Sequence, residues 1–299
     1  MWLLLAFLSA TLLGFYDVFK KKSLKDNAVL PVLFLNTLFS SLIFLPFILL
    51  SAFVPGVLEG TMFDVPVVGW EVHKFIIIKS FIVLSSWILG YFGMKHLPIT
   101  IVGPINATRP VMVLVGAMLV FGERLNLYQW IGVLLAVVSF FMRSRSGKKE
   151  GIDFKHNKWI LFIVLAAVAG AVSGLYDKYL MKQLPPMVVQ SWYNVYQVFI
   201  MCPILALLWW PKRKSSTPFR WDWAIIFISI FLCAADFVYF YALSYEDSMI
   251  SIVSMVRRGS VIVSFLFGAM MFREKNLKSK AIDLILVLIG MIFLYLGTK

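Results

Sequence analysis

Charged residues are scarce in this 299-residue sequence. Asp, Glu, Lys and Arg together make up 14% of it, whereas a soluble domain carries about 25%. Apolar residues make up 61%, against about 45–50% in a soluble domain, and the mean hydropathy is +0.88. A soluble fold of this length has too little interior to bury so much apolar surface. The sequence therefore predicts an integral membrane protein, with the lipid bilayer as its solvent.

Cysteine and catalytic motifs are also lacking. Only Cys202 and Cys233 are present, both inside apolar runs, which excludes a disulfide-stabilised secreted domain. The sequence has no Gly-x-Ser-x-Gly, no P-loop and no His-Glu-x-x-His motif. Its histidines, His73, His96 and His156, lie in three separate connections and form no metal-ligand set. We therefore expect no enzyme activity, no cofactor and no metal site, and without an ATP-binding motif any transport must draw on gradients.

Acidic residues are outnumbered, with 15 Asp and Glu against 28 Lys and Arg, so the formal net charge is +13. Such an excess can indicate nucleic-acid binding. Here most of the basic residues stand in short loops between apolar runs, which is the pattern that orients membrane helices. We therefore expect no nucleic-acid partner.

Ten apolar runs have about the 20 residues that a membrane-spanning helix needs. Short polar connections separate most of them. The predicted fold is therefore all-α, with ten transmembrane helices and no soluble catalytic domain. The runs are Trp2–Phe19, Ala28–Phe53, Phe75–Met94, Ile99–Phe121, Leu127–Met142, Trp159–Leu180, Met187–Trp210, Trp223–Leu243, Met249–Phe272 and Ala281–Gly297.

The chain carries an internal duplication. Gly14–Leu24 aligns without gaps to Gly174–Leu184, with five identities in the eleven positions. Gly116–Glu123 matches Gly268–Glu274 with one gap. Each match occupies the same place in its half of the chain.

The duplication predicts two five-helix repeats, at residues 1–142 and 159–299, joined by a basic linker at 143–158. Because five is odd, the second repeat enters the membrane from the opposite side to the first. The halves are then inverted repeats, an arrangement typical of transporters that alternate access around a midplane site.

The fourth run holds Pro104 and Pro110, and a Gly-x-x-x-x-x-Gly-Glu-Arg-Leu motif ends at Leu125, with a looser copy from Gly268 to Asn276. Together with the five-plus-five helices, these features resemble the EamA repeat of the drug/metabolite transporter superfamily over nearly the whole chain. The resemblance implies a transporter fold. It leaves the substrate open, because the superfamily moves amino acids, amines, sugar phosphates and nucleotide sugars.

Charged residues inside the apolar runs are the candidate site, because a charge at the bilayer centre costs about 2.5–3.5 kcal/mol and usually faces a cavity or a partner. Arg109 lies roughly 15 Å into its run and Arg258 roughly 13–14 Å, at about 1.5 Å per residue. Both depths are near the middle of a core about 30 Å thick. An ungapped alignment that starts with Phe92 against Tyr241 places Arg109 opposite Arg258, so the repeat relates the two.

Arg257 adds a third cation, and Asp236, at similar depth in the preceding run, could neutralise one of them. Three positive charges and one negative charge predict a bound anion, and guanidinium groups suit phosphate and carboxylate. The resemblance implies the same, because phosphate-translocating members of the superfamily carry basic residues on the fourth and ninth helices. The alternative is that each arginine is structural, bonded to backbone carbonyls and to Asp236.

Further residues complete the predicted site. Asp17 and Asp177 each follow a Gly-x-Tyr sequence, and they either form ion pairs at helix ends or gate the two ends of the transporter. Trp87, Tyr91 and Tyr239 either line the substrate cavity or face lipid and its interfaces.

The sequence favours a secondary transporter of a small anionic metabolite, phosphorylated or carboxylated, that works by alternating access with exchange or ion coupling. The alternatives are transport of neutral or amino-acid-like solutes, and a role as a membrane assembly partner or lipid-phosphate flippase partner. We expect a multi-pass protein of a bacterial inner (plasma) membrane, a monomer or dimer, whose partners are the substrate and the bilayer.

The orientation in the membrane is contested. Of the 28 Lys and Arg, 19 fall in the loops after odd-numbered runs. The positive-inside rule assigns those loops to the cytoplasm, which leaves both termini outside. The family resemblance implies cytoplasmic termini instead. We expect the termini outside, because the bias is large and the loops are short.

Overall fold

The computed structural model describes residues 1–54, 56–96, 105–106, 108–145, 157–260, 262–263, 267 and 277–297. Helices are the regular elements of these residues, none of which lies in a β-strand. The helices are α1 (Trp2–Leu24), α2 (Val29–Phe53), α3 (Trp70–His96), α5 (Arg109–Phe121), α6 (Leu127–Arg145), α7 (Lys158–Met181), α8 (Pro186–Ile204), η1 (Leu205–Trp209), η2 (Trp210–Lys212), α9 (Ala224–Ser244), α10 (Ile250–Arg258) and α12 (Leu277–Leu296).

Six helical stretches are long and apolar enough to cross a membrane. They hold 21 to 27 residues, or about 31–40 Å at a rise of about 1.5 Å per residue, against a hydrocarbon core about 30 Å thick. They are α1, α2, the Trp70–Gly90 part of α3, α7, the Pro186–Lys212 stretch of α8 with η1 and η2, and α9. These helices confirm an all-helical chain of the membrane type, while the number of ten spans stays a prediction.

Many large apolar side chains lie on the surface, although a core of other apolar side chains is buried. Large apolar side chains are exposed, such as Leu4 at 60% and Leu119 at 81%. Polar side chains are buried, such as Ser9 at 0% and Asn36 at 3%. Extensive exposed apolar surface marks contact with lipid or with a partner.

Several helices extend beyond the apolar runs that predict them, and α1 and α3 are two examples. α1 continues past Phe19 through the basic triplet to Leu24, because lysine forms helices well. The Lys20 ammonium lies 5.2 Å from the centre of the Tyr16 ring, one turn back on the same helix. α3 runs from Trp70 to His96 rather than from Phe75 to Met94, so His73 and His96 lie in this helix rather than in connections.

The chain divides into two compact units, each made from both halves of the sequence. The first unit holds residues 1–81 and 179–246, and the second holds 82–178 and 247–299.

In the first unit, α1 packs along α9, and α2 packs against α8 and α9. The Ser9 hydroxyl of α1 donates to the Ala235 carbonyl of α9 at 2.7 Å. Further along the same pair of helices, the Phe15 and Phe231 rings stack with centres 5.3 Å apart. The first helix of one half of the sequence is therefore held by the third long helix of the other half.

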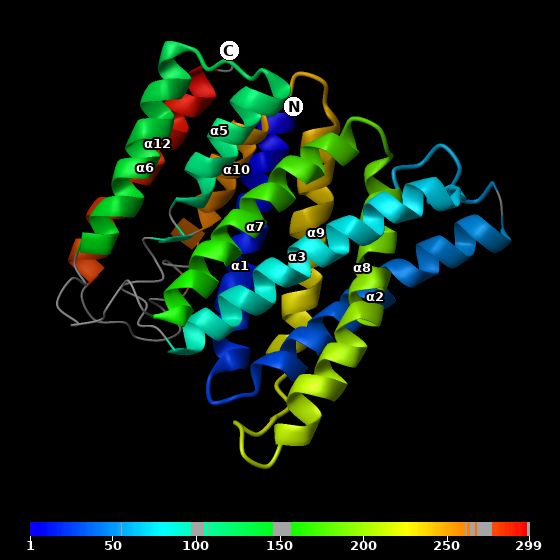
Figure 1. The fold of residues 1–299 in the computed structure, drawn as a ribbon. Helices are drawn as coiled ribbons and strands as arrows, with labels where there is room; N and C mark the ends of the chain where they lie inside the picture. The colour runs from blue at the N-terminus through cyan, green and yellow to red at the C-terminus, as the bar shows by residue number, and fades with distance from the viewer. Residues whose placement is uncertain are drawn as a thin grey trace. The chain divides into compact units, whose positions relative to one another are not determined.

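In the second unit, α6 packs along α12, and the two helices run side by side in Figure 1. A Cβ on Gly132 would lie only 2.7 Å from the Gly290 carbonyl oxygen, so this pair needs glycine for its close approach. In the same unit, the Ser86 hydroxyl of α3 donates to the Ala166 carbonyl of α7 at 2.8 Å.

Serines of α3 and α9 make matching contacts. The sequence alignment that matches Phe92 with Tyr241 also aligns Ser80 with Ser229 and Ile76 with Ile225. The Ser80 hydroxyl lies 2.9 Å from the Ile76 carbonyl and 3.4 Å from the Tyr193 carbonyl of α8.

The Ser229 hydroxyl lies 3.2 Å from the Ile225 carbonyl and 3.2 Å from the Asn36 carbonyl of α2. The third helix of each half thus contacts the second helix of the other half through an aligned serine.

Candidate functional site

The predicted site residues fall in both units. Asp17, Asp236 and Tyr239 belong to the first unit, whereas Trp87, Arg109, Asp177, Arg257 and Arg258 belong to the second. Tyr91 lies in α3, but its side chain is outside the described part of the structure. Asp177 and Tyr239 are buried, at 6% and 4% exposure, and the other described members are half-buried.

The three arginines of the predicted site lie at the ends of two short helices of the second unit that pack together. Arg109 is the first residue of α5, and Arg257 and Arg258 are the last two residues of α10. α5 has 13 residues and α10 has 9, about 20 Å and about 14 Å at the usual rise, so neither alone spans the bilayer. Residues 260 and 262–263 are again helical, so α10 is followed by a break at Gly259, and membrane helices that are broken in this way often hold binding sites.

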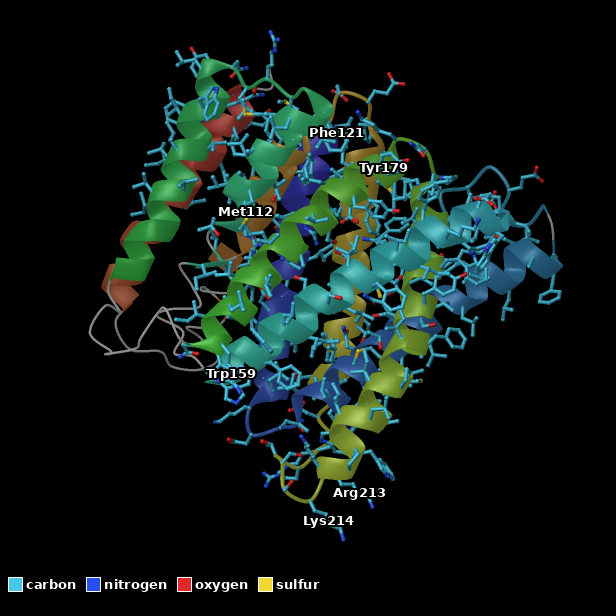
Figure 2. All side chains as sticks on the ribbon, viewed as in Figure 1. Met112, Phe121, Trp159, Tyr179, Arg213 and Lys214 are labelled. Carbon is cyan, nitrogen blue, oxygen red and sulfur yellow. The ribbon has the colours of Figure 1, made fainter. Side chains whose placement is uncertain are left out.

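The direction of the two helices brings the arginines to one end. Glu123, just beyond the end of α5, contacts the start of α10 at Ile250. Figure 1 shows the two helices running antiparallel, and Figure 2 labels Met112 near the start of α5 and Phe121 at its end. Arg109 therefore lies at the same end of the α5–α10 pair as Arg257 and Arg258.

Glu123 closes the other end of this pair. Its Oε1 accepts from the backbone N–H of Ile250 at 2.7 Å. Its Oε2 accepts from the backbone N–H of Ser251 at 3.2 Å and from the Ser251 hydroxyl. Met249, the N-cap residue of α10, provides no side-chain bond, so the Glu123 carboxylate satisfies these donors and its charge complements the helix dipole.

Arg109 is tied to the backbone of α7. Its Nη2 donates to the Gly170 carbonyl at 2.8 Å. A Cβ on Gly170 would lie 2.6 Å from Arg109 Nε, so the guanidinium lies against α7 where any larger residue would displace it. One guanidinium nitrogen thus serves a structural bond, and Arg109 presents five N–H donors in all.

Two adjacent charged residues at the end of α7 are buried. Lys178 is 2% exposed and Asp177 is 6% exposed. The Lys178 ammonium donates to the Ser248 hydroxyl at 2.5 Å, next to the residues that precede α10. The pseudo-equivalent Asp17 of the first unit is only half-buried, so the two aspartates that the sequence treats alike have different surroundings.

Sequence reasoning missed Lys79. This lysine is 2% exposed, and its ammonium lies 4.5 Å from the centre of the Tyr193 ring and 4.8 Å from that of Phe240. It follows the start of α3 by nine residues, or about 13–14 Å at the usual rise. Counted from the predicted start at Phe75 it is only four residues deep, which made it look like a residue of the helix end.

Within the described residues, no three His, Cys, Asp or Glu side chains are grouped as metal ligands. Cys202 is exposed and Cys233 is buried, and both are free thiols.

Comparison with known proteins identifies the class. The EamA-like transporter family matches residues 1–145 and 157–296, in two copies. The chain belongs to the EamA-like transporter family and fits the drug/metabolite transporter superfamily. The Gly-Glu-Arg-Leu motif and the duplication therefore predict the family correctly.

Similar proteins support the same class. A protein of Archaeoglobus fulgidus named "Uncharacterized transporter" is 24% identical over 276 residues, covering 91% of this chain and 90% of its own. One solved crystal structure has a TM-score of 0.71 at 16% identity, covering 99% of this chain and 95% of the other. That likeness concerns the fold alone.

Proposed function

We propose that this protein is a secondary transporter of a small anionic metabolite, phosphorylated or carboxylated, bound by Arg109, Arg257 and Arg258. It works by alternating access, through exchange or coupling to an ion gradient, in a bacterial inner membrane as a monomer or dimer. Its ten helices form two inverted repeats, residues 1–142 and 159–299, with residues 143–158 as the linker.

The single observation that carries the proposal is that Arg109, Arg257 and Arg258 lie at the same end of the packed pair α5 and α10. Three cations at the ends of two short helices favour an anion, and guanidinium groups bind phosphate or carboxylate with two parallel hydrogen bonds. The aligned partners Arg109 and Arg258 come from opposite halves of the sequence, as expected of a site at a repeat interface.

The serine contacts support the inverted repeats. Ser80 and Ser229 occupy aligned positions, and each contacts the second helix of the other half. Halves related by a two-fold axis in the membrane plane would exchange contacts in this manner. Such crosswise packing allows the two halves to swap conformations, which alternating access requires.

One observation favours the alternative of a neutral or amino-acid-like substrate. The bond from Arg109 to the Gly170 carbonyl is the backbone bond expected of a purely structural arginine. Under this alternative, the arginines hold α5, α7 and α10 together and do not bind the transported solute.

Counterflow in liposomes separates the candidates. Purified protein is reconstituted, the liposomes are loaded with one unlabelled compound, and uptake of the labelled compound is measured. The compounds are 3-phosphoglycerate, succinate, alanine and glycerol. We expect uptake of the phosphorylated or dicarboxylated compound and none of glycerol. Uptake of alanine or glycerol alone would support the neutral-solute alternative, and no uptake of any compound would favour the assembly or lipid-partner role.

A further inference from the structure

Lys79 lies in the first unit at a junction of three helices. Its ammonium faces the Tyr193 ring of α8 at 4.5 Å and the Phe240 ring of α9 at 4.8 Å. The next residue, Ser80, contacts the Tyr193 carbonyl at 3.4 Å, which holds this turn of α3 against α8. The two ring faces stabilise the buried Lys79 cation.

The fold itself does not require a cation at this position. The aligned residue of α9 is Ile228, which is 2% exposed, like Lys79. An apolar side chain therefore fills the same place in the other half of the duplicated chain. Lys79 is an asymmetric feature of a pseudo-symmetric protein, which indicates a function rather than packing.

The neighbouring face of α8 carries amide side chains. Gln190, Asn194 and Gln197 follow one another at helical spacing and share a face with Tyr193. All three are buried, at 1%, 5% and 1% exposure. Gln190 is fixed, because its Nε2 donates to the Cys233 carbonyl of α9 at 2.8 Å.

Two amide atoms on this face have no hydrogen-bond partner among the described residues: the acceptor Gln190 Oε1 and the donor Gln197 Nε2. Buried polar atoms in native proteins are nearly always bonded, to protein, water or a ligand. When Asn36 of α2 is aligned with Asn194 of α8, Val32 aligns with Gln190 and Phe39 aligns with Gln197. Like Lys79, the two glutamines are therefore absent from the other half of the chain.

We propose that the junction of α3, α8 and α9 in the first unit is a binding site for a small hydroxylated carboxylate. The carboxylate lies against the Lys79 ammonium, which faces the Tyr193 and Phe240 rings. It also accepts a hydrogen bond from Gln197 Nε2. The hydroxyl donates to Gln190 Oε1. This inference does not rest on the arginine site of the second unit.

Thermal unfolding of the purified full chain in detergent tests the site with three probes at matched ionic strength: glycolate, acetate and glycolamide. A ligand at about ten times its Kd raises the folded-to-unfolded ratio about elevenfold. We expect glycolate to raise the Tm most, acetate to raise it less because it lacks the hydroxyl, and the uncharged glycolamide to leave it unchanged. Equal shifts with glycolate and glycolamide, or no shift with either, overturn the proposal and leave buried water as the partner of the two glutamines.

Variants assign the contacts. Lys79→Met should abolish the shifts with glycolate and acetate, and Gln197→Leu should reduce both. Gln190→Leu should remove only the advantage of glycolate over acetate, and it keeps the proposal testable if Lys79→Met fails to fold. Lys178→Met, which removes a lysine equally buried in the second unit, is the matched control and should keep both shifts.

Glycolate shifts that persist in Lys79→Met, or an advantage of glycolate over acetate that persists in Gln190→Leu, contradict the site. Its failure is distinguishable from failure of the proposed function, because 3-phosphoglycerate counterflow depends on Arg109 and Arg258.

Discussion

The Arg109 guanidinium lies directly against Gly170, its Nη2 bonded to the Gly170 carbonyl at 2.8 Å and its Nε 2.6 Å from where a Cβ would stand. The missing side chain of Gly170 creates the place for the arginine. α7 therefore determines where the first charge of α5 lies, although 61 positions separate the two residues in the sequence.

Gly170→Ala should displace Arg109 and lower uptake of the anionic substrate roughly tenfold, the effect of losing one charge-assisted contact of about 1.5 kcal/mol. Gly174→Ala is the matched control, because on the same helix an added Cβ meets only Val113 Cγ2 at 3.8 Å. The measurement is the initial counterflow rate in liposomes. Because both changes act on the same guanidinium, Gly170→Ala combined with Arg109→Ala should lower uptake no further than Arg109→Ala. Additive losses would show that Gly170 acts elsewhere.

Arg109→Ala and Arg258→Ala should each abolish uptake while leaving folded protein in the membrane. The physical reason is the loss of charge-assisted hydrogen bonds to the substrate. Arg→Lys at either position should restore uptake only in part, because an ammonium cannot form the two parallel bonds of a guanidinium. Counterflow and folded yield are measured for all four variants, and normal transport by both alanine variants would refute the anion site.

Glu123→Ala should loosen the start of α10. Replacing a side chain that caps a helix N-terminus costs about 0.5–2 kcal/mol, and here Ile250 and Ser251 lose their shared acceptor. Hydrogen exchange should accelerate at the backbone amides of residues 250–251. Arg124→Ala, at the exposed neighbouring position, should leave these amides protected. Unchanged exchange in Glu123→Ala would mean that another group caps α10.

The sequence predicts the family correctly, because the duplication and the Gly-Glu-Arg-Leu motif mark the repeat. It predicts Arg109 to lie about 15 Å inside a run that starts at Ile99, whereas Arg109 is the first residue of α5, and its role in binding stays a prediction. The sequence does not predict contacts between elements that are far apart in the chain. Glu123 reads as a loop residue, and only the packing of α5 on α10 shows it as a cap.

Lys79 was missed for a local reason. Hydropathy places the start of this span at Phe75, but the helix begins five positions earlier, at Trp70. The polar residues in the first turns of α3 make the helix seem to start later than it does, so the depth of Lys79 along the helix is underestimated. Its function could have been suspected from the aligned Ile228, because a duplication that pairs Lys with Ile marks a departure from the shared fold.

The charge bias of the loops predicts that both termini lie outside the cytoplasm. An alkaline phosphatase fused to the C-terminus should therefore be active, because the enzyme matures only outside the cytoplasm, whereas a fluorescent protein fused there should stay dark. Fusions after Lys214, in a loop that the bias assigns to the cytoplasm, should behave oppositely. A fluorescent C-terminal tail would show that the family's usual orientation holds.

Asp236 is the candidate for ion coupling, because it is a half-buried carboxylate within α9. If it carries the coupling proton, Asp236→Asn should spare counterflow, which needs no net proton movement, and abolish uptake driven by a pH gradient. If it contributes to substrate binding instead, both activities should fall together. Both assays are run on the same liposome preparation. Asp222→Asn is the control, because Asp222 lies just before α9, outside the span, and its carboxylate accepts a hydrogen bond from the Ala224 N–H. Undiminished pH-driven uptake and counterflow in Asp236→Asn would exclude Asp236 from both roles.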